Sequence, residues 1–337
     1  MDESTTTNEE TTNEETTNEE RWANKERRPQ VERLGDVFLL DSNHAGYPGT
    51  VGVYLLPGEG GSFALIECST VPSLPRLEEA IREAGFEPEG LSDILVTHIH
   101  LDHAGAAGAL ASRYGARVYV HEIGAPHLAD PSRLIVSATR IYEDEMERLW
   151  GKIEPVPAGQ LHAVGGGESL RVAGRRIDVL YTPGHASHHV SYLLDDGSLL
   201  TGDAAAIRFA GSKVIRPATP PPETDLDIWG RSTKTMLAAA PQRLLLTHFG
   251  EVTDPAAHLE RMREETHRWA EAVLEGMRRG EDEAALQARI AALSLEALTA
   301  EGASPELVFK HRVTSHDEMT VQGLTRYWRK HHPERLA

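Results

Sequence analysis

A six-residue run from His98 to His103, with the sequence HIHLDH, constrains this chain more than any other feature. It directly follows residues 94–97, an apolar stretch with the pattern of a buried strand. Neutral imidazole and carboxylate suit zinc and its first-row neighbours. Because side chains alternate along an extended segment, the first and third residues of the run face the same way, and the following turn can direct the last two toward a second point. The run therefore predicts ligands for two adjacent metals.

Three further candidate ligands follow strand-like segments later in the chain. His185 ends Thr-Pro-Gly-His, Asp203 ends Thr-Gly-Asp, and His248 ends Thr-His. Pro-Gly favours a loop just before His185, and loops at strand ends are where functional side chains gather. Each residue alone has the simpler interpretation of a capping or hydrogen-bonded residue. Their order after the histidine-rich run favours metal binding for all three.

This series of four motifs resembles the metallo-β-lactamase superfamily over about residues 31–250. The resemblance implies an α/β fold, a four-layered αββα sandwich, with two divalent metal ions at one edge of the paired sheets. Zn²⁺ is the expected metal, and Mn²⁺ or Fe²⁺ would also be compatible. In the implied ligand set, His98, His100 and His185 bind one metal, Asp102, His103 and His248 bind the other, and Asp203 bridges the two.

Three more residues are expected near the metals without binding them. Glu67 ends the strand-like residues 63–66, where relatives commonly carry Asp, and would hydrogen-bond a ligand histidine. An N-cap is the alternative role for Glu67. His189 matches a second histidine often found after Thr-Pro-Gly-His, and His44 lies in a loop that the resemblance places at the metal edge. Both also fit simpler structural roles.

Alternating strand-like and helix-like segments support the α/β class independently of the resemblance. Residues 51–56, 63–66 and 117–120 have the short apolar pattern of buried strands. Residues 74–84 have apolar positions spaced for one face of a helix, with Gly85 placed to end it. Strands and helices are therefore expected to share one domain.

Composition and patterning divide the chain into three parts. Residues 1–20 repeat Thr-Thr-Asn-Glu-Glu three times and carry eight acidic and no basic residues. This part is predicted to be a disordered tail, with an acidic interaction tail as the alternative. Residues 21–253 form the predicted metal-binding domain, in which residues 121–165 are either a lid or a surface excursion. Residues 254–337 are a predicted helical extension that packs on the sandwich, forms a homodimer interface or lines the pocket.

Charge and composition limit the partners and the compartment. The formal net charge of −18 opposes binding to nucleic acid, which needs a basic surface. No apolar stretch approaches the ~18 residues of a membrane span, and no export signal is evident. The single cysteine, Cys68, fits a reducing compartment. We therefore expect a cytoplasmic protein that acts on a small molecule, without nucleic-acid or membrane partners.

The ligand set predicts a hydrolase in which two metals share a water and acidify it, so that a bridging hydroxide attacks an ester, a thioester or a related substrate. Asp102 and Asp203 are the carboxylates with an assigned catalytic role. Two alternatives follow from the resemblance. Lactonases of this pattern carry Tyr where this chain has Ala206, and persulfide dioxygenases use one iron bound by residues corresponding to His98, His185 and Asp203. Metal content separates a two-metal hydrolase from a mononuclear iron oxidoreductase.

Overall fold

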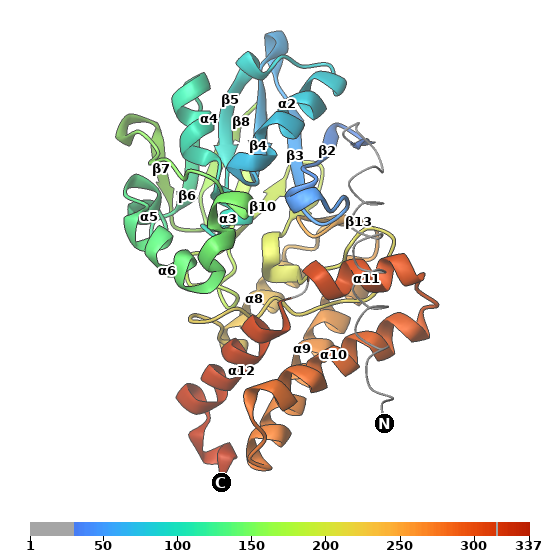
Figure 1. Cartoon of the computed structure of the whole chain (residues 1–337). Helices are drawn as coiled ribbons and strands as arrows, with labels where there is room; N and C mark the ends of the chain where they lie inside the picture. Colours follow the sequence, from blue (N-terminus) through green and yellow to red (C-terminus); the bar gives the residue numbers. More distant parts are fainter. Residues whose placement is uncertain (1–29, 315) are drawn as a thin grey trace, which may run out of the picture.

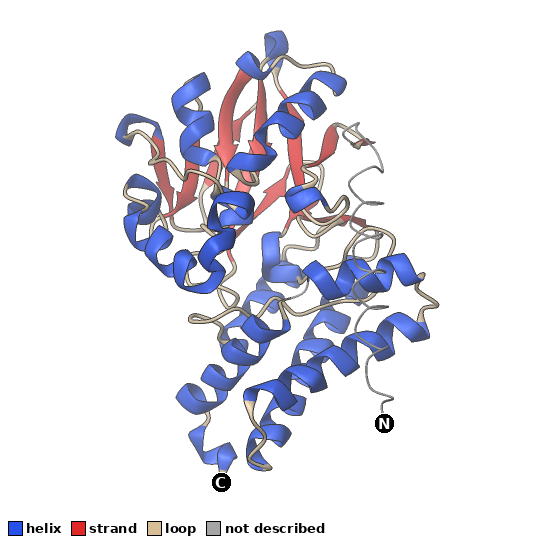
Figure 2. Cartoon of the chain, viewed as in Figure 1, coloured by secondary structure: helices blue, strands red, loops and turns tan. Residues whose placement is uncertain are grey.

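The computed structural model describes residues 30–314 and 316–337. Two stacked β-sheets form the centre, and helices cover both outer faces, as Figure 1 and Figure 2 show. The repeat at residues 1–20 lies outside the described residues, so its disorder stays a prediction. Within the described part, none of the helices is both long and apolar enough to cross a bilayer.

The first sheet has seven strands in sequence order. Strands β1 to β4 pair antiparallel, and β4 to β7 pair parallel. Its strands are β1 (Val31–Leu34), β2 (Val37–Asp41), β3 (Gly52–Pro57), β4 (Phe63–Ile66), β5 (Leu91–Leu95), β6 (Arg117–His121) and β7 (Leu161–Val164).

The second sheet has six strands in the order β13-β12-β11-β10-β9-β8. All neighbours pair antiparallel except β11 and β12, which are parallel. Its strands are β8 (Ser169–Val172), β9 (Arg175–Tyr181), β10 (Val190–Leu194), β11 (Ser198–Leu200), β12 (Arg243–Leu246) and β13 (Gly250–Val252).

Helices connect and cover these strands, and four of them follow one another at the C-terminal end. They are α2 (Leu74–Glu83), α3 (Leu101–Ala104), α4 (Ala107–Tyr114), α5 (Ala125–Ala129), α6 (Ser132–Tyr142), α7 (Met146–Leu149), α8 (Leu226–Ala238), α9 (Pro255–Arg278), α10 (Glu283–Ala300), α11 (Pro305–Thr314) and α12 (Asp317–His331).

Three apolar cores hold four layers together. One core lies between the sheets and includes Tyr54 and Leu245. A second joins the other face of the first sheet to α2 and α4, and a third joins the second sheet to α8, α9, α10 and α12. Neighbouring strand residues therefore enter different cores: Leu244 packs under helices while Leu245 faces the other sheet. The predicted αββα sandwich is confirmed.

Segment 121–165 and the C-terminal helices lie outside the sandwich itself, and both reach the edge that carries the ligand motifs. In segment 121–165, α6 and α7 share a small core with Leu101, the residue between His100 and Asp102, and the segment ends in β7 of the first sheet. The C-terminal helices pack on the second sheet through their apolar faces. Buried Lys310 of α11 also donates to the carbonyls of Pro48 and Ala210, both at 3.2 Å, which ties α11 to two loops of the sandwich.

Candidate metal centre

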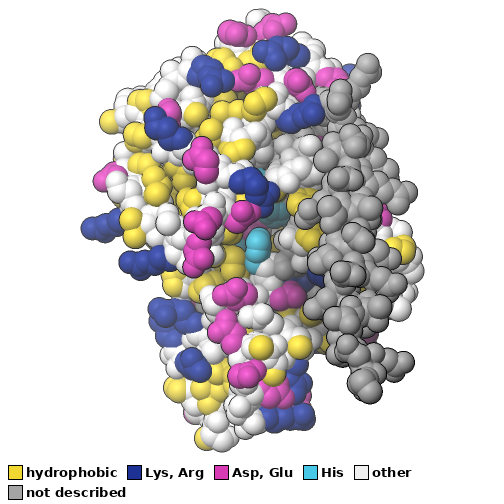
Figure 3. Space-filling view, viewed as in Figure 1, with side chains coloured by type: hydrophobic (Ala, Val, Ile, Leu, Met, Phe, Trp, Pro, Cys, Tyr) yellow, Lys and Arg dark blue, Asp and Glu magenta, His cyan; other side chains and the backbone are white. Residues whose placement is uncertain are grey.

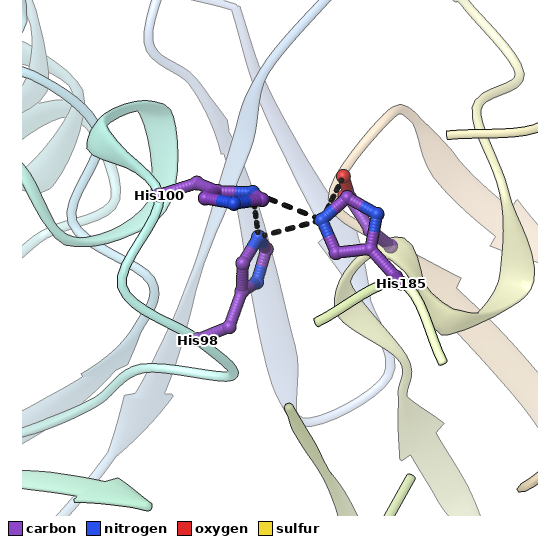
Figure 4. Close-up of side chains that lie close together, drawn as sticks. His98, His100 and His185 are labelled. Carbon is purple, nitrogen blue, oxygen red and sulfur yellow. Dashed lines mark hydrogen bonds and ion pairs between the residues drawn. The ribbon is translucent and has the colours of Figure 1, made fainter. Parts of the chain in front are cut away.

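Three histidines and one carboxylate form the first group of candidate ligands. Nδ1 of His100 lies 2.9 Å from Nε2 of His98 and 2.9 Å from Nε2 of His185. The Nε2 atoms of His98 and His185 are 3.2 Å apart, and Oδ2 of Asp203 lies 3.4 Å from Nε2 of His185. Figure 4 shows the three rings pointing toward one another from two different segments. All four side chains can offer one atom to a common metal ion.

The second group is made by Asp102, His103 and His248. Oδ2 of Asp102 lies 3.6 Å from Nε2 of His103 and 3.4 Å from Nε2 of His248. The two ring nitrogens are 3.3 Å apart. The structure thus brings together all seven residues that the motifs singled out, in the two sets that the resemblance implies.

The carboxylate of Asp203 lies between the two groups. Its Oδ2 faces His185 of the first group, and its Oδ1 lies 3.2 Å from Nε2 of His103 and 3.3 Å from Nε2 of His248. Among the described residues, Oδ1 is buried without a hydrogen-bond partner. A buried acceptor of this kind is unusual, and a cation bound beside it would satisfy it.

Hydrogen bonds on the far side of the rings fix their orientation. Nδ1 of His185 donates to the carbonyl of Ala218 at 2.7 Å, and Nδ1 of His248 donates to that of Thr50 at 2.6 Å. Nδ1 of His103 donates to Glu67 at 3.0 Å. With the proton on Nδ1, each ring directs its Nε2 lone pair into the cluster. Metal-binding histidines are typically held in this way.

The donor set fits divalent cations. Lone pairs from several rings converge within about hydrogen-bonding distance, and two carboxylates lie between them. Nitrogen and oxygen donors of this kind suit zinc and its first-row neighbours. Mutually repelling lone pairs would be stabilised by a positive ion among them. The residues present therefore fit the metals that the motifs predict.

Electrostatics differ between the two groups. Burial lowers the pKa of His100 to about 4 and also lowers the pKa of His98 and His185, which favours neutral rings. For His248, burial opposes the charged form, but the Asp203 and Asp102 carboxylates outweigh it and raise the pKa to about 10. Burial likewise opposes ionisation of Asp203, yet the neighbouring histidines hold its pKa well below the ordinary value. The carboxylates around the second group thus stabilise positive charge there, whether it is a proton on a ring or a cation that replaces that proton.

Two glycines allow the ligand loops to come this close. Gly184 has φ +135°, and a Cβ there would collide with the backbone of Trp229 in α8. Gly202 has φ +49°, and a Cβ there would meet the Thr97 hydroxyl and lie 2.7 Å from Nε2 of His189. Both positions favour glycine for its conformation and for its lack of a side chain. They explain Pro-Gly-His and Thr-Gly-Asp in the sequence.

Glu67 is buried at the junction of several ligand segments. Its Oε1 accepts hydrogen bonds from Thr97 Oγ1 at 2.6 Å, from His103 and, at 3.2 Å, from Thr247 Oγ1. Because Thr97 donates to Glu67, its oxygen can accept from Nδ1 of His98 at 3.0 Å. Glu67 therefore contacts one candidate ligand directly and a second through Thr97.

His189 and His44 lie near the cluster in different ways. Nε2 of His189 accepts from the backbone N–H of Asp203 at 3.2 Å, and its Nδ1 donates to Thr182 Oγ1 at 2.9 Å. His44 lies in the short η1 turn (His44–Gly46) and stacks on Trp150 with ring centres 5.3 Å apart. His189 thus supports the Asp203 loop, whereas His44 belongs to the surroundings of the cluster.

Sequence reasoning did not assign a role to the threonines beside the ligands. Thr97 directly precedes the histidine-rich run, Thr182 and Thr247 begin two later motifs, and each hydroxyl bonds Glu67 or His189. Their recurrence just before candidate ligands was a visible signal of this hydrogen-bonded layer. Tyr142 and Trp150 were also missed as residues near the cluster.

Comparison with known proteins agrees with the motifs and the fold. Residues 46–248, more than half of the chain, match the family model of the metallo-beta-lactamase superfamily. The chain belongs to the metallo-beta-lactamase superfamily. Members of this superfamily generally bind divalent metals, which agrees with the two groups of candidate ligands found here.

Two relatives from the superfamily match the chain over part of their length. The chain is 33% identical over 177 residues to the metallo-beta-lactamase fold-containing protein ST1585 of Sulfurisphaera tokodaii, a match covering 51% of this chain and 66% of that protein. It is 34% identical over 130 residues to a hydroxyacylglutathione hydrolase of Rhodopseudomonas palustris, covering 38% of this chain and 40% of the relative. The chain thus spans less than two thirds of either relative.

Solved structures match a larger share of the chain than these two relatives do. The metallo-beta-lactamase family protein TTHA1429 from Thermus thermophilus superposes with a TM-score of 0.67 at 26% identity, covering 88% of this chain and 94% of that one. The archaeal protein ST1585 from Sulfolobus tokodaii gives a TM-score of 0.58 at 27% identity, over 70% of this chain and 87% of its own.

Proposed function

We propose that this chain is a hydrolase that depends on two divalent metal ions, with Zn²⁺ as the expected metal, and that it cleaves an ester, a thioester or a related small molecule. One observation carries the proposal: the Asp203 carboxylate directs one oxygen to each of two groups of candidate ligands. A mononuclear site would not need Asp102, His103 and His248 as a second complete group.

In this proposal, His98, His100 and His185 hold the first ion, Asp102, His103 and His248 hold the second, and Asp203 contacts both. When bound, two such ions would acidify a shared water and stabilise negative charge that develops on the substrate.

The chain's own residues supply the rest. Glu67 and the carbonyls of Ala218 and Thr50 keep three imidazoles in the tautomer that leaves Nε2 free to bind. His189 holds the Asp203 backbone, so that the carboxylate stays between the groups. These contacts place fixed charges and lone pairs where the substrate's reacting group would enter, without any need to reorganise during the reaction.

A panel of esters, thioesters, lactones and phosphodiesters, assayed with metal-loaded protein, tests the proposal. On the best substrate, Asp203→Ala should lower turnover by orders of magnitude while the protein stays folded. His189→Ala should cost about ten- to hundredfold, the usual effect of removing a residue that supports a metal ligand. Near-normal turnover by Asp203→Ala with two metals bound would overturn the assigned mechanism, and absence of hydrolysis across the panel would count against a hydrolase.

A further inference from the structure

Four ring-bearing side chains from distant segments gather beside the candidate metal centre. His44 stacks on Trp150 at 5.3 Å, Trp150 meets Tyr142 edge-to-face at 4.9 Å, and Tyr142 meets His316 edge-to-face at 6.0 Å between ring centres. They come from the η1 turn, from the residue after α7, from the end of α6, and from the residue before α12. We call these four residues the aromatic wall.

The wall lies next to the second group of candidate ligands. Trp150 packs in one apolar cluster with Leu101, the residue that precedes Asp102. The negative charge of Asp102 also acts on two wall residues: it adds to burial in raising the pKa of Tyr142, and it opposes the lowering of the pKa by burial in His44. Figure 3 shows histidine side chains in a recess near the centre of this face of the molecule. A substrate at the metals would therefore extend toward the wall.

Polar atoms of the wall lack strong partners within the described part of the chain. Nδ1 of His44 and Nε1 of Trp150 are buried without a hydrogen bond to any described residue. The Tyr142 hydroxyl contacts the Met319 sulfur at 3.8 Å, and thioether sulfur is a weak acceptor. Since buried polar atoms are normally paired, this combination of ring surfaces and unsatisfied polar atoms is characteristic of a binding site.

The arrangement of the four rings favours a ligand with a flat aromatic ring over one with an aliphatic ring. Aromatic side chains interact with another ring through stacked or edge-to-face geometry, a preference that an aliphatic ring of similar size does not share. His44 and Tyr142 are half-buried and His316 is exposed, so the wall presents ring surface toward the outside, while Trp150 is buried behind it.

We propose that the aromatic wall binds an aromatic ring carried by the ester or thioester substrate, and that the Tyr142 hydroxyl donates a hydrogen bond to an acceptor oxygen near that ring. This inference rests on the proposed hydrolase function, because it names the substrate class of the same site. Tyr142 and Trp150 are then specificity-determining residues, and segment 121–165 forms part of the substrate site.

A binding experiment tests the inference without requiring turnover. The metal-loaded protein is titrated with phenylacetamide and with cyclohexylacetamide, two neutral amides of similar size, and followed by chemical shifts. We expect the wild type to bind the phenyl compound about three- to tenfold more tightly. His44→Ala and Trp150→Leu should bring this ratio close to one. Tyr142→Phe should weaken both ligands by about fivefold, because both carry the same amide oxygen.

Tyr114→Phe is the matched control, since the Tyr114 hydroxyl bonds Glu78 on another part of the surface, and it should change neither affinity. If Trp150→Leu does not fold, His44→Ala still decides the question. Equal affinities in the wild type, or a ratio that survives His44→Ala, would overturn the inference. A phenyl preference without hydrolysis of any substrate would uphold the aromatic binding site and reject the proposed function, whereas hydrolysis without the preference would do the opposite.

Discussion

Glu67 Oε1 accepts a hydrogen bond from Nδ1 of His103 at 3.0 Å, and both side chains are fully buried. A carboxylate in this position fixes the ring and makes its other nitrogen a better metal ligand. The same oxygen receives the Thr97 hydroxyl, which in turn meets His98. One buried acid therefore holds residues of both candidate ligand groups.

Glu67→Gln should weaken metal binding by about ten- to hundredfold, because glutamine keeps the size of the side chain but removes its charge. Titration against a competing chelator measures the affinity. Glu78→Gln, in a half-buried pair with Arg113 and Tyr114, is the control and should bind metal as the wild type does. Unchanged affinity in Glu67→Gln would show that this contact does not support the ligands.

Gly202→Ala should destabilise the fold by about 2–4 kcal/mol, since it combines a left-handed backbone with a collision against Thr97 and His189. Gly302→Ala is the matched control: its φ is +70°, but a Cβ there would meet nothing within 4 Å. This variant should lose only about 1 kcal/mol. Denaturant unfolding of both proteins compares the two costs, and equal losses would mean that the tight approach at Gly202 is unimportant.

Arg216 anchors the C-terminal helices to the sandwich. Its side chain is buried, donates to Asp317 at 2.8 Å and to Ser294 at 2.5 Å, and lies 4.8 Å from the ring centre of Trp269. Arg216→Met should therefore cost about 2–4 kcal/mol of unfolding free energy, because Asp317 loses its partner while partly buried. Arg268→Met breaks a pair with Glu296 that is largely exposed and should cost about 1 kcal/mol or less. Similar losses would contradict an anchoring role.

His258 predicts a pH dependence of stability. Burial lowers its pKa to about 4, and its Nε2 donates to the Ala205 carbonyl at 2.9 Å. Because the folded pKa lies below that of the unfolded chain, the unfolded state binds the extra proton first. The contribution of His258 is complete above about pH 6.5 and is lost as the pH falls toward 4.

In His258→Gln, unfolding free energy should accordingly fall less steeply over this range, by up to about 1.4 kcal/mol per pH unit. Denaturant titrations at several pH values measure the slopes. His267→Gln, at an exposed position of the same helix, controls for the introduction of glutamine. Parallel slopes for the wild type and His258→Gln would refute the assignment.

Local patterns predicted the α/β class because the strands are short apolar runs, and residues 63–66 coincide with β4. The four-layered sandwich was implied by the resemblance of the motifs. The strand expected at residues 94–97 begins and ends earlier in the structure, as β5 (Leu91–Leu95). The charged residue Asp93 interrupts the apolar pattern, so the beginning of this strand was not predicted. In the structure Asp93 is buried and pairs with Arg117 at 2.7 Å. Motif order likewise indicated the seven candidate ligands, since each of the four segments that carry them follows a strand.

The aromatic wall could not be predicted in the same way. Tyr142 and Met319 are 177 positions apart in the chain, and only the packing of α6 and the C-terminal helices brings them together. Nothing in the local pattern around Tyr142 distinguishes a pocket residue from one on a surface helix. Contacts of this kind depend on how separate elements dock, which periodicity and motif spacing do not encode.

The central claim is that Asp203 joins two complete metal sites. The most direct test is elemental analysis of the fully loaded protein, with metal expressed as equivalents per chain. Two equivalents in the wild type are expected, because seven side chains exceed what one tetrahedral site can use. One equivalent per chain, with no further binding at higher metal concentration, would contradict the two-metal account.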